Sequence, residues 1–123
     1  MTDRVGEFAA FRARLNERIL DQDNQVVRRF FALDTQTYRA GALDVRTKEM
    51  LGLVASLVLR CDDCISYHVE QCRNAGVDRE QFFEVFSVGL VVGGSIVIPH
   101  LRRAVDFLDQ LEAAVPAVGA TKV

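Results

Sequence analysis

The chain has 123 residues, half of them apolar, and its 15 basic and 17 acidic side chains give a formal net charge of −2. This length predicts one domain, and the charge disfavours a nucleic-acid-binding protein, which needs a basic patch or stripe. The apolar content is high for a small monomer, so we expect part of it to lie between subunits.

Targeting signals give an expectation for the compartment. The opening residues, MTDRVGEF, are polar and contain none of the apolar core of a signal peptide. The longest apolar run, at 85–99, is shorter than the roughly 18–20 residues of a membrane span and carries Gly93 and Gly94. We therefore expect a cytoplasmic protein with no membrane partner. In that compartment a close cysteine pair is more often catalytic or metal-binding than a structural disulfide.

The first half of the chain has helical periodicity. A first helix is predicted from Arg4 to Leu20, and 21–24 interrupt it before a second helix that runs to about Arg39. Asp44 is the predicted cap of a third helix, which ends near Leu59 and is apolar on every side, so we expect it to be central. The predicted apolar stripe of the first helix consists of Val5, Phe8, Phe11, Leu15 and Ile19.

The second half continues the helical pattern. A fourth helix is predicted to begin beside CDDC at 61–64 and to end at Gly76, a favoured residue just after a helix. Asp78 is the predicted cap of a fifth helix, Gly93 and Gly94 end it, and a sixth runs from Ser95 to about Ala114. The sequence thus predicts an all-α fold of six helices in a single domain, 1–123, with its core at 43–113 and a frayed tail at 115–123.

The apolar stretch from Phe86 to Ile98 allows two interpretations. It can be a buried core helix followed by a turn, or it can form a contact between subunits. A single small bundle has few places to bury so much aliphatic surface, which keeps the second interpretation open.

The octet CDDCISYH at 61–68 carries the main candidate site. On one helix, Cys64, His68 and Cys72 share a face because each lies four residues from the next. Cys61 lies at the helix start, where unpaired N–H groups and the positive end of the helix dipole stabilise a thiolate. His68 can accept the proton of the Cys64 thiol. Asp62 and Asp63 oppose thiolate formation, although acids also suit a helix start.

Zinc is the competing interpretation of the same residues. The pattern C-x2-C-x3-H-x3-C superficially resembles a zinc knuckle. On an intact helix, however, Cys64 and Cys72 would be about 12 Å apart along the axis. Zinc–sulfur bonds are about 2.3 Å long, so these two thiols cannot bind one ion. We therefore expect no metal. Cys72 is interpreted as a small buried hydrophobic residue, and His100, after Pro99, as a residue of helix start or packing.

Glu49 lies on the buried-looking third helix, twelve residues before Cys61, and can be the proton partner of His68. Considered singly, Glu49 is an ordinary first-turn glutamate and His68 an ordinary helix histidine. The nucleophile stays open at this point. The helix start favours Cys61 as the more exposed thiol, whereas the histidine four residues on favours Cys64.

The segment from Leu43 to about Leu111 resembles the AhpD-like, or carboxymuconolactone decarboxylase-like, family. The resemblance rests on RTKEMLGLVAS with Glu49, on CDDCISYH, and on HVEQCRNAGVDREQFFEVFSVG. It implies an all-helical orthogonal bundle that assembles into trimers or hexamers. The CxxC pair is typical of the alkyl hydroperoxidase branch, since the decarboxylases proper do not have it.

The resemblance also implies an activity, that of a thiol-dependent alkyl hydroperoxide reductase or disulfide oxidoreductase. Cys64 would be the attacking thiol, Cys61 its resolving partner in a redox-active disulfide, and His68 with Glu49 the proton relay. The substrate would be a peroxide or disulfide, and an external protein or small dithiol would be the reductant, with no other cofactor. Two features depart from the family: Asp63 stands where relatives often have a histidine, and the chain is nearer a single helical unit.

Two alternatives to the peroxidase remain open. One is a decarboxylase-like or isomerase-like enzyme acting on a small organic acid, with His68 and Glu49 as its acid–base groups. The other is a helical module whose cysteines only sense the redox state.

Overall fold

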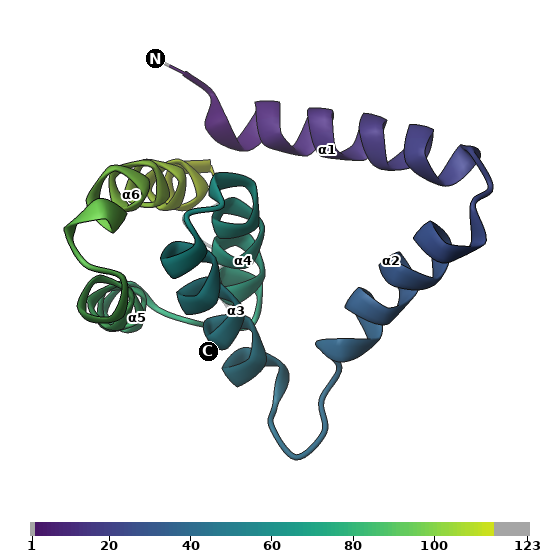
Figure 1. The fold of residues 1–123 in the computed structure, drawn as a ribbon. Helices are drawn as coiled ribbons and strands as arrows, with labels where there is room; N and C mark the ends of the chain where they lie inside the picture. Colours follow the sequence, from purple (N-terminus) through teal and green to yellow (C-terminus); the bar gives the residue numbers. More distant parts are fainter. Residues whose placement is uncertain (1, 115–123) are drawn as a thin grey trace.

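The computed structural model of the protein describes residues 2–114, and this part of the chain is helical with no strand. The described residues form six α-helices, which are labelled in Figure 1. In chain order they are α1 (Arg4–Asp21), α2 (Gln25–Thr37), α3 (Val45–Leu59), α4 (Asp62–Asn74), α5 (Arg79–Gly93) and α6 (Ile98–Ala114), and a 3-10 turn, η1 (Ser95–Val97), precedes α6. Within 2–114 no helix is both long enough and apolar enough to cross a membrane.

The helix ends follow the capping residues that the sequence contains. The side chains of Asn24, Asp44 and Asp78 each accept a hydrogen bond from a backbone N–H in the first turn of α2, α3 and α5. Gly76 follows α4 with a φ of 92°, a conformation that glycine adopts without a Cβ penalty. The predicted all-α fold with six helices is therefore confirmed.

Two boundaries differ from the prediction. α2 ends at Thr37, two residues before the predicted Arg39, and the chain turns at Tyr38. Ser95 opens a 3-10 turn instead of the sixth α-helix itself, which begins at Ile98. The predicted frayed tail at 115–123 lies outside the described residues.

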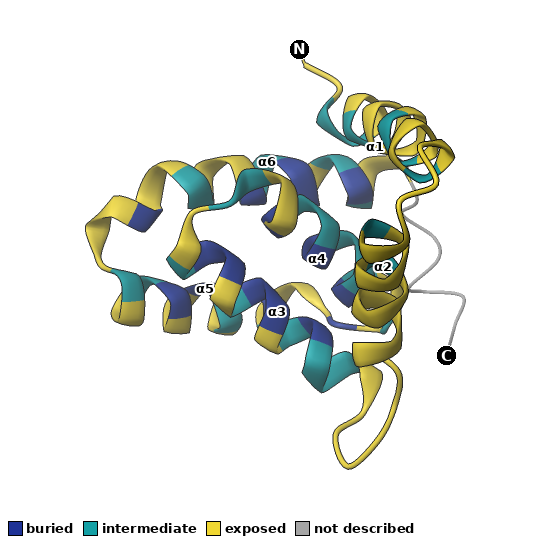
Figure 2. Cartoon of the chain, turned by 45° about the vertical axis from the view of Figure 1, so that its right-hand side comes forward, coloured by how far each residue is buried: buried dark blue, intermediate teal, exposed yellow. Residues whose placement is uncertain are grey.

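Helices α3, α4, α5 and α6 pack together and enclose the core. Figure 2 shows the buried residues on these four helices, with the arm of α1 and α2 exposed. As expected, α3 is central, since it contacts both α4 and α5. The largest fully buried side chains are Phe82, Phe86, Phe107, Leu53, Leu57, Ile65 and Leu108.

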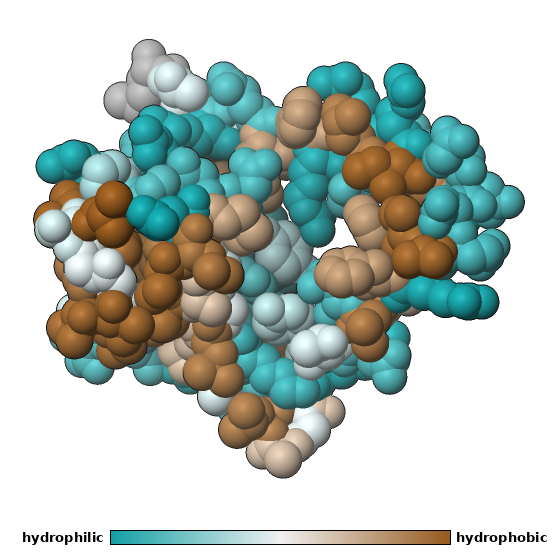
Figure 3. All heavy atoms as spheres, viewed as in Figure 1, coloured by the Kyte–Doolittle hydropathy of each residue, from teal (hydrophilic) through white to brown (hydrophobic). Residues whose placement is uncertain are grey.

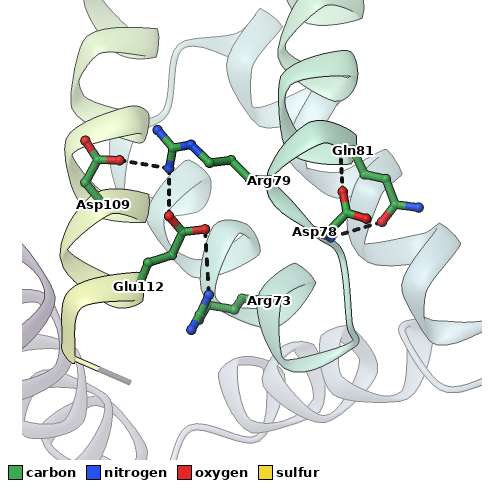
Figure 4. Close-up of polar contacts among 6 residues, drawn as sticks. All are labelled: Arg73, Asp78, Arg79, Gln81, Asp109 and Glu112. Carbon is green, nitrogen blue, oxygen red and sulfur yellow. Dashed lines mark hydrogen bonds and ion pairs between the residues drawn. The ribbon is translucent and has the colours of Figure 1, made fainter. Parts of the chain in front are cut away.

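Ion pairs connect the start of α5 to the end of α6. Arg79 lies 2.9 Å from Asp109 and 2.7 Å from Glu112, and Arg73 of α4 lies 3.8 Å from the second oxygen of Glu112 (Figure 4). Beside them, Asp78 and Gln81 form a capping box at the start of α5. These contacts hold the ends of α4, α5 and α6 together, away from the cysteine pair at the other end of α4.

Helices α1 and α2 form a bent arm beside the four-helix core (Figure 1). The apolar stripe predicted on the first helix contacts the core only near its start, where Phe8 packs edge-on against Phe107 with 5.8 Å between ring centroids. Neither α1 nor α2 contains a buried residue, and Phe11 is 55% exposed. Within this single chain, the arm leaves much of its apolar surface open to solvent.

The apolar stretch at 86–98 is partly buried in the core and partly exposed, so the predicted core helix is confirmed for one of its faces and the contact between subunits stays a prediction. Phe86 and Val97 are buried in the core, whereas one face of α5 and η1 remains exposed. We call this face the α5 patch; it consists of Val88, Val91, Val92 and Ile96. Figure 3 shows hydrophobic residues gathered over this part of the surface.

Candidate active site

The cysteine pair lies where α3 passes into α4. Arg60 adopts a left-handed conformation, and the Cys61 N–H donates a hydrogen bond to the Ser56 carbonyl at 3.1 Å, so the turn between the helices is tight. Cys61 is the N-cap of α4, and its sulfur accepts the backbone N–H of Cys64 at 3.3 Å. The two cysteines form a disulfide, with 5.3 Å between their Cα atoms.

The exposure of the two cysteines corrects one expectation. The position of Cys61 at the helix start predicted that it is the more exposed of the two cysteines. In the structure Cys61 is half-buried and Cys64 is exposed. The reason is the capping position: the sulfur of Cys61, the N-cap, accepts the backbone N–H of Cys64, whereas Cys64 itself is exposed in the first turn of α4. Cys61 is therefore not the more exposed residue of the oxidised pair, and the identity of the nucleophile stays a prediction.

Glu49 and His68 form a buried pair behind the disulfide. The Nδ1 of His68 lies 2.8 Å from the Glu49 carboxylate, and the two residues are 8% and 3% exposed. Glu49 comes from the first turns of α3 and His68 from the second turn of α4, so the packing of α3 against α4 brings them together. A carboxylate oxygen can only accept, so Nδ1 carries the shared proton and Nε2 is the nitrogen left for other partners.

Gly52 allows the imidazole ring of His68 to pack closely against α3. It is buried in α3, one turn after Glu49, and a Cβ at this position would lie 2.6–2.9 Å from three atoms of the His68 ring. The ring thus lies directly on the α3 backbone. Gly52 was not among the residues predicted for the site; its signal in the sequence is a glycine in the middle of a helix, which is unfavourable unless close packing requires it.

Two tyrosines that were not predicted as site residues lie against the same ring. The Tyr38 hydroxyl lies 3.4 Å from Nε2 of His68, and Tyr67 meets the ring edge-on with 5.2 Å between centroids. Arg12 of α1 stacks over Tyr67 at 4.5 Å. Burial, followed by the charge of Glu49, raises the pKa of Tyr38 and of Tyr67 above the usual value, so both hydroxyls stay protonated.

A cavity of about 380 Å³ lies between α1 and the start of α4. Cys64, Tyr67 and His68 line its inner side together with Asp63. Its outer wall is largely apolar and comes from α1, with Phe8, Phe11, Leu15 and Ile19 beside Arg12 and Asn16, and Asp34 lies at the α2 side. The exposed cysteine and the buried histidine thus border one space that is large enough for a small organic molecule.

The remaining sequence candidates lie around this space. His100, for which the sequence offered no partner, lies 2.7 Å from Asp62, and Arg103 lies 3.5 Å from the same carboxylate. Asp62 is therefore paired across to α6, which offsets the charge that it places beside the cysteine pair. Cys72 is fully buried, as predicted, and burial raises the pKa of its thiol to about 12. Residues 2–114 contain no group of three or more histidine, cysteine or acidic side chains that could hold a metal ion.

Fold and site together define a small helical protein with a CxxC disulfide at a helix start and a buried glutamate–histidine pair beside it. The model of the carboxymuconolactone decarboxylase family matches residues 24–107. The chain belongs to this family, and the AhpD-like resemblance is confirmed. The match begins earlier than the segment from Leu43 that carried the resemblance, and it includes α2.

Known relatives are close in structure. Two crystal structures of TM1620 from Thermotoga maritima superpose with TM-scores of 0.85 and 0.86 at 55% and 51% identity. They cover 88% and 92% of this chain and 95% and 96% of theirs. TM1620 belongs to the same family, and an involvement in the antioxidative response has been suggested for it.

Two further relatives are more distant. The apo structure of lpg0406 from Legionella pneumophila has a TM-score of 0.81 at 18% identity, over 89% of this chain and 97% of that one, and supports the fold. Uncharacterized protein 4 in the cox locus of Paracoccus denitrificans is 32% identical over 85 residues, which are 69% of this chain and 77% of that protein.

Proposed function

We propose that this protein is a thiol-dependent oxidoreductase that reduces alkyl hydroperoxides and uses Cys64 as its nucleophile. One observation carries the proposal, which is the arrangement around the disulfide between Cys61 and the exposed Cys64. Cys64 lines the same cavity as His68, and His68 is hydrogen-bonded to the buried Glu49. The antioxidative role suggested for TM1620 agrees with it.

The reaction begins from the reduced pair. His68 accepts the Cys64 proton, and the thiolate attacks the terminal peroxide oxygen, so that the O–O bond breaks and Cys64 becomes a sulfenic acid. The leaving alkoxide takes a proton from His68 and departs as the alcohol. Glu49 holds the ring through Nδ1 and stabilises its positive charge while the proton rests on it.

Two further steps close the cycle. The Cys61 thiol condenses with the sulfenic acid, which forms the Cys61–Cys64 disulfide and releases water. An external dithiol then reduces the disulfide by exchange and is itself oxidised to a disulfide. The same pair can exchange with a disulfide substrate instead of a peroxide, which is the oxidoreductase form of the proposal.

The cavity supports an organic peroxide as substrate. Its α1 wall offers the apolar side chains Phe8, Phe11, Leu15 and Ile19 to an alkyl or aryl group while Cys64 faces the space from the other side. Asp63, which stands where relatives often have a histidine, lines the same cavity and cannot supply an imidazole to the relay.

Assembly belongs to the same proposal. The exposed apolar surfaces of the α1–α2 arm and of the α5 patch are more than a small monomer usually presents. We expect copies of the chain to cover them in a trimer or hexamer. The cavity lies under α1, so an assembly that fixes the arm would also fix the outer wall of the site.

The proposal is tested by oxidation of a reduced dithiol donor in the presence of an organic hydroperoxide. Turnover is expected for the wild type and is expected to vanish in Cys61→Ser and in Cys64→Ser. Activity that survives both substitutions would refute it. Turnover of an organic acid that is indifferent to thiol alkylation would favour the decarboxylase-like alternative. A reversible disulfide without turnover would favour a redox sensor.

A further inference from the structure

Tyr38 is the residue by which the α2 arm reaches the buried pair. It follows the last turn of α2, a helix with no buried residue of its own. Its hydroxyl lies 3.4 Å from Nε2 of His68, and the two rings are 5.2 Å apart between centroids. Tyr38 thus brings a hydroxyl from the end of α2 to the imidazole of His68.

The backbone on both sides of Tyr38 is held by one lysine. The Nζ of Lys48 donates hydrogen bonds to the Thr37 carbonyl at 2.9 Å and to the Arg39 carbonyl at 2.7 Å. Lys48 is the neighbour of Glu49 in the first turns of α3. The same turn of α3 therefore positions both hydrogen-bond partners of His68. Glu49 is the partner of Nδ1, and Lys48 holds the backbone around Tyr38, whose hydroxyl is the partner of Nε2.

Each nitrogen of the His68 imidazole can take part in only one hydrogen bond, so the partners of the two nitrogens compete. A neutral imidazole has one donor and one acceptor nitrogen. Nδ1 donates to Glu49, so Nε2 is the nitrogen that remains to accept the proton of Cys64. In the disulfide form, Nε2 faces the hydroxyl of Tyr38, which burial keeps protonated and able to donate.

We propose that Tyr38 is a positioning residue that occupies Nε2 of His68 and that the Cys64 thiol must displace its hydroxyl to form the thiolate–imidazolium pair. The inference rests on the proposed thiol chemistry of Cys64 and His68. Tyr38 stabilises the neutral pair, in which its hydroxyl donates to Nε2. In the ion pair, Nε2–H donates to the Cys64 sulfur and that stabilisation is lost.

Other charged or titratable groups lie around the same ring. They are Glu49 from α3, Tyr67 and Cys64 from α4, and Arg12 of α1 and Asp34 of α2, which border the cavity. A substitution of Tyr38 by Phe leaves all of these in place. It removes only the hydroxyl and retains the ring that packs against His68.

The test is the pH dependence of Cys64 alkylation by iodoacetamide in the reduced protein, resolved at Cys64 by mass spectrometry. In Tyr38→Phe the rate at pH values below the wild-type midpoint is expected to rise about two- to fivefold, the effect of losing one weak hydrogen bond from the neutral state. The midpoint is expected to move toward lower pH. An unchanged or slower rate would overturn the inference, since Tyr38 would then be inert or would help to ionise Cys64.

Ser87→Ala is the control, because it removes a hydroxyl from an exposed residue of α5 that lies outside the site and donates its hydrogen bond to the Phe83 carbonyl. Its profile is expected to match the wild type; an equal shift in both variants would also overturn the inference. Alkylation requires no peroxide, so a protein without peroxidase turnover can still show the Tyr38 effect, and the two proposals fail separately.

Nitrogen-15 spectra of the imidazoles test the inference without any substitution at Tyr38. The His68 signals are assigned by comparison with His100→Gln. In the oxidised protein we expect a protonated Nδ1 and an accepting Nε2, and reduction is expected to change the Nε2 signal. A doubly protonated ring at neutral pH in the oxidised protein would overturn the inference.

Discussion

Substitution of Gly52 by alanine introduces one methyl group against the imidazole of His68. The new Cβ would lie 2.6 Å from the nearest ring atom, whereas ordinary contact begins at 3.4 Å, so the ring has to retreat by about 0.8 Å. Glu49 lies on the same helix as Gly52, so a retreat from α3 lengthens the 2.8 Å bond between Glu49 and Nδ1. The substitution therefore separates the two members of the buried pair.

Two opposing contributions to stability decide the expected result. Replacing glycine by alanine inside a helix stabilises it by about 0.5–1 kcal/mol. Overpacking a filled site costs about 1–3 kcal/mol. We expect a net loss of up to about 2.5 kcal/mol in the free energy of unfolding. We also expect a tenfold to hundredfold slower oxidation of the reduced protein by peroxide, since a displacement near 1 Å can have that effect.

The assays are urea unfolding of the oxidised protein and stopped-flow oxidation of the reduced protein. Ala55→Gly is the control, because Ala55 is an exposed residue of α3 and the change reports the helix preference alone. Ala55→Gly is expected to lower the free energy of unfolding by about 1 kcal/mol and to leave the rate of oxidation by peroxide unchanged. If Gly52→Ala stabilises the protein by the amount that Ala55→Gly costs, and oxidation keeps its rate, the close approach of His68 to α3 is refuted.

Three other predictions concern Glu49, Cys72 and the α5 patch. Glu49→Gln preserves shape but removes the charge beside Nδ1, so peroxide oxidation should slow by about 10²-fold while far-UV circular dichroism stays the same; an unaltered rate would exclude Glu49 from the relay. The thiol of Cys72 has a pKa of about 12 in the folded chain, against 9.0 as its ordinary value. Its contribution to the free energy of unfolding should thus be intact below about pH 9 and fall between pH 9 and 12. Denaturant titrations at several pH values should show this fall in the wild type and not in Cys72→Ala; the same pH dependence of the free energy of unfolding in both proteins would contradict the prediction. Val91 is 86% exposed in the single chain, so Val91→Asp should lower the molar mass measured by light scattering and leave the helical content unchanged, whereas an unchanged mass would remove the α5 patch from the interface.

Local signals accounted for most of the fold because each acts within a few residues. Asn24, Asp44 and Asp78 cap helices wherever the chain places them, and Gly76 ends α4 through its own backbone freedom. The four-residue spacing of Cys64 and His68 is equally local, and both residues line one cavity.

Contacts between helices could not be read from the sequence in the same way. Nothing near Tyr38 in the sequence points to His68, yet the path of α2 brings the Tyr38 hydroxyl to within 3.4 Å of Nε2. His100 had no visible partner until the packing of α4 and α6 placed it against Asp62. The relative exposure of Cys61 and Cys64 was predicted wrongly because Cys61, as the N-cap, turns its sulfur toward the backbone N–H of Cys64.

The central claim is that Cys64 is the thiol that peroxide attacks. It is tested most directly by adding an organic hydroperoxide to the reduced protein and trapping sulfenic acid with a dimedone-type probe in Cys61→Ser and Cys64→Ser. The account predicts a sulfenic acid at Cys64 in Cys61→Ser, none in Cys64→Ser, and a Cys61–Cys64 disulfide formed in the wild type with one equivalent of peroxide consumed. A probe adduct found only in Cys64→Ser would contradict it.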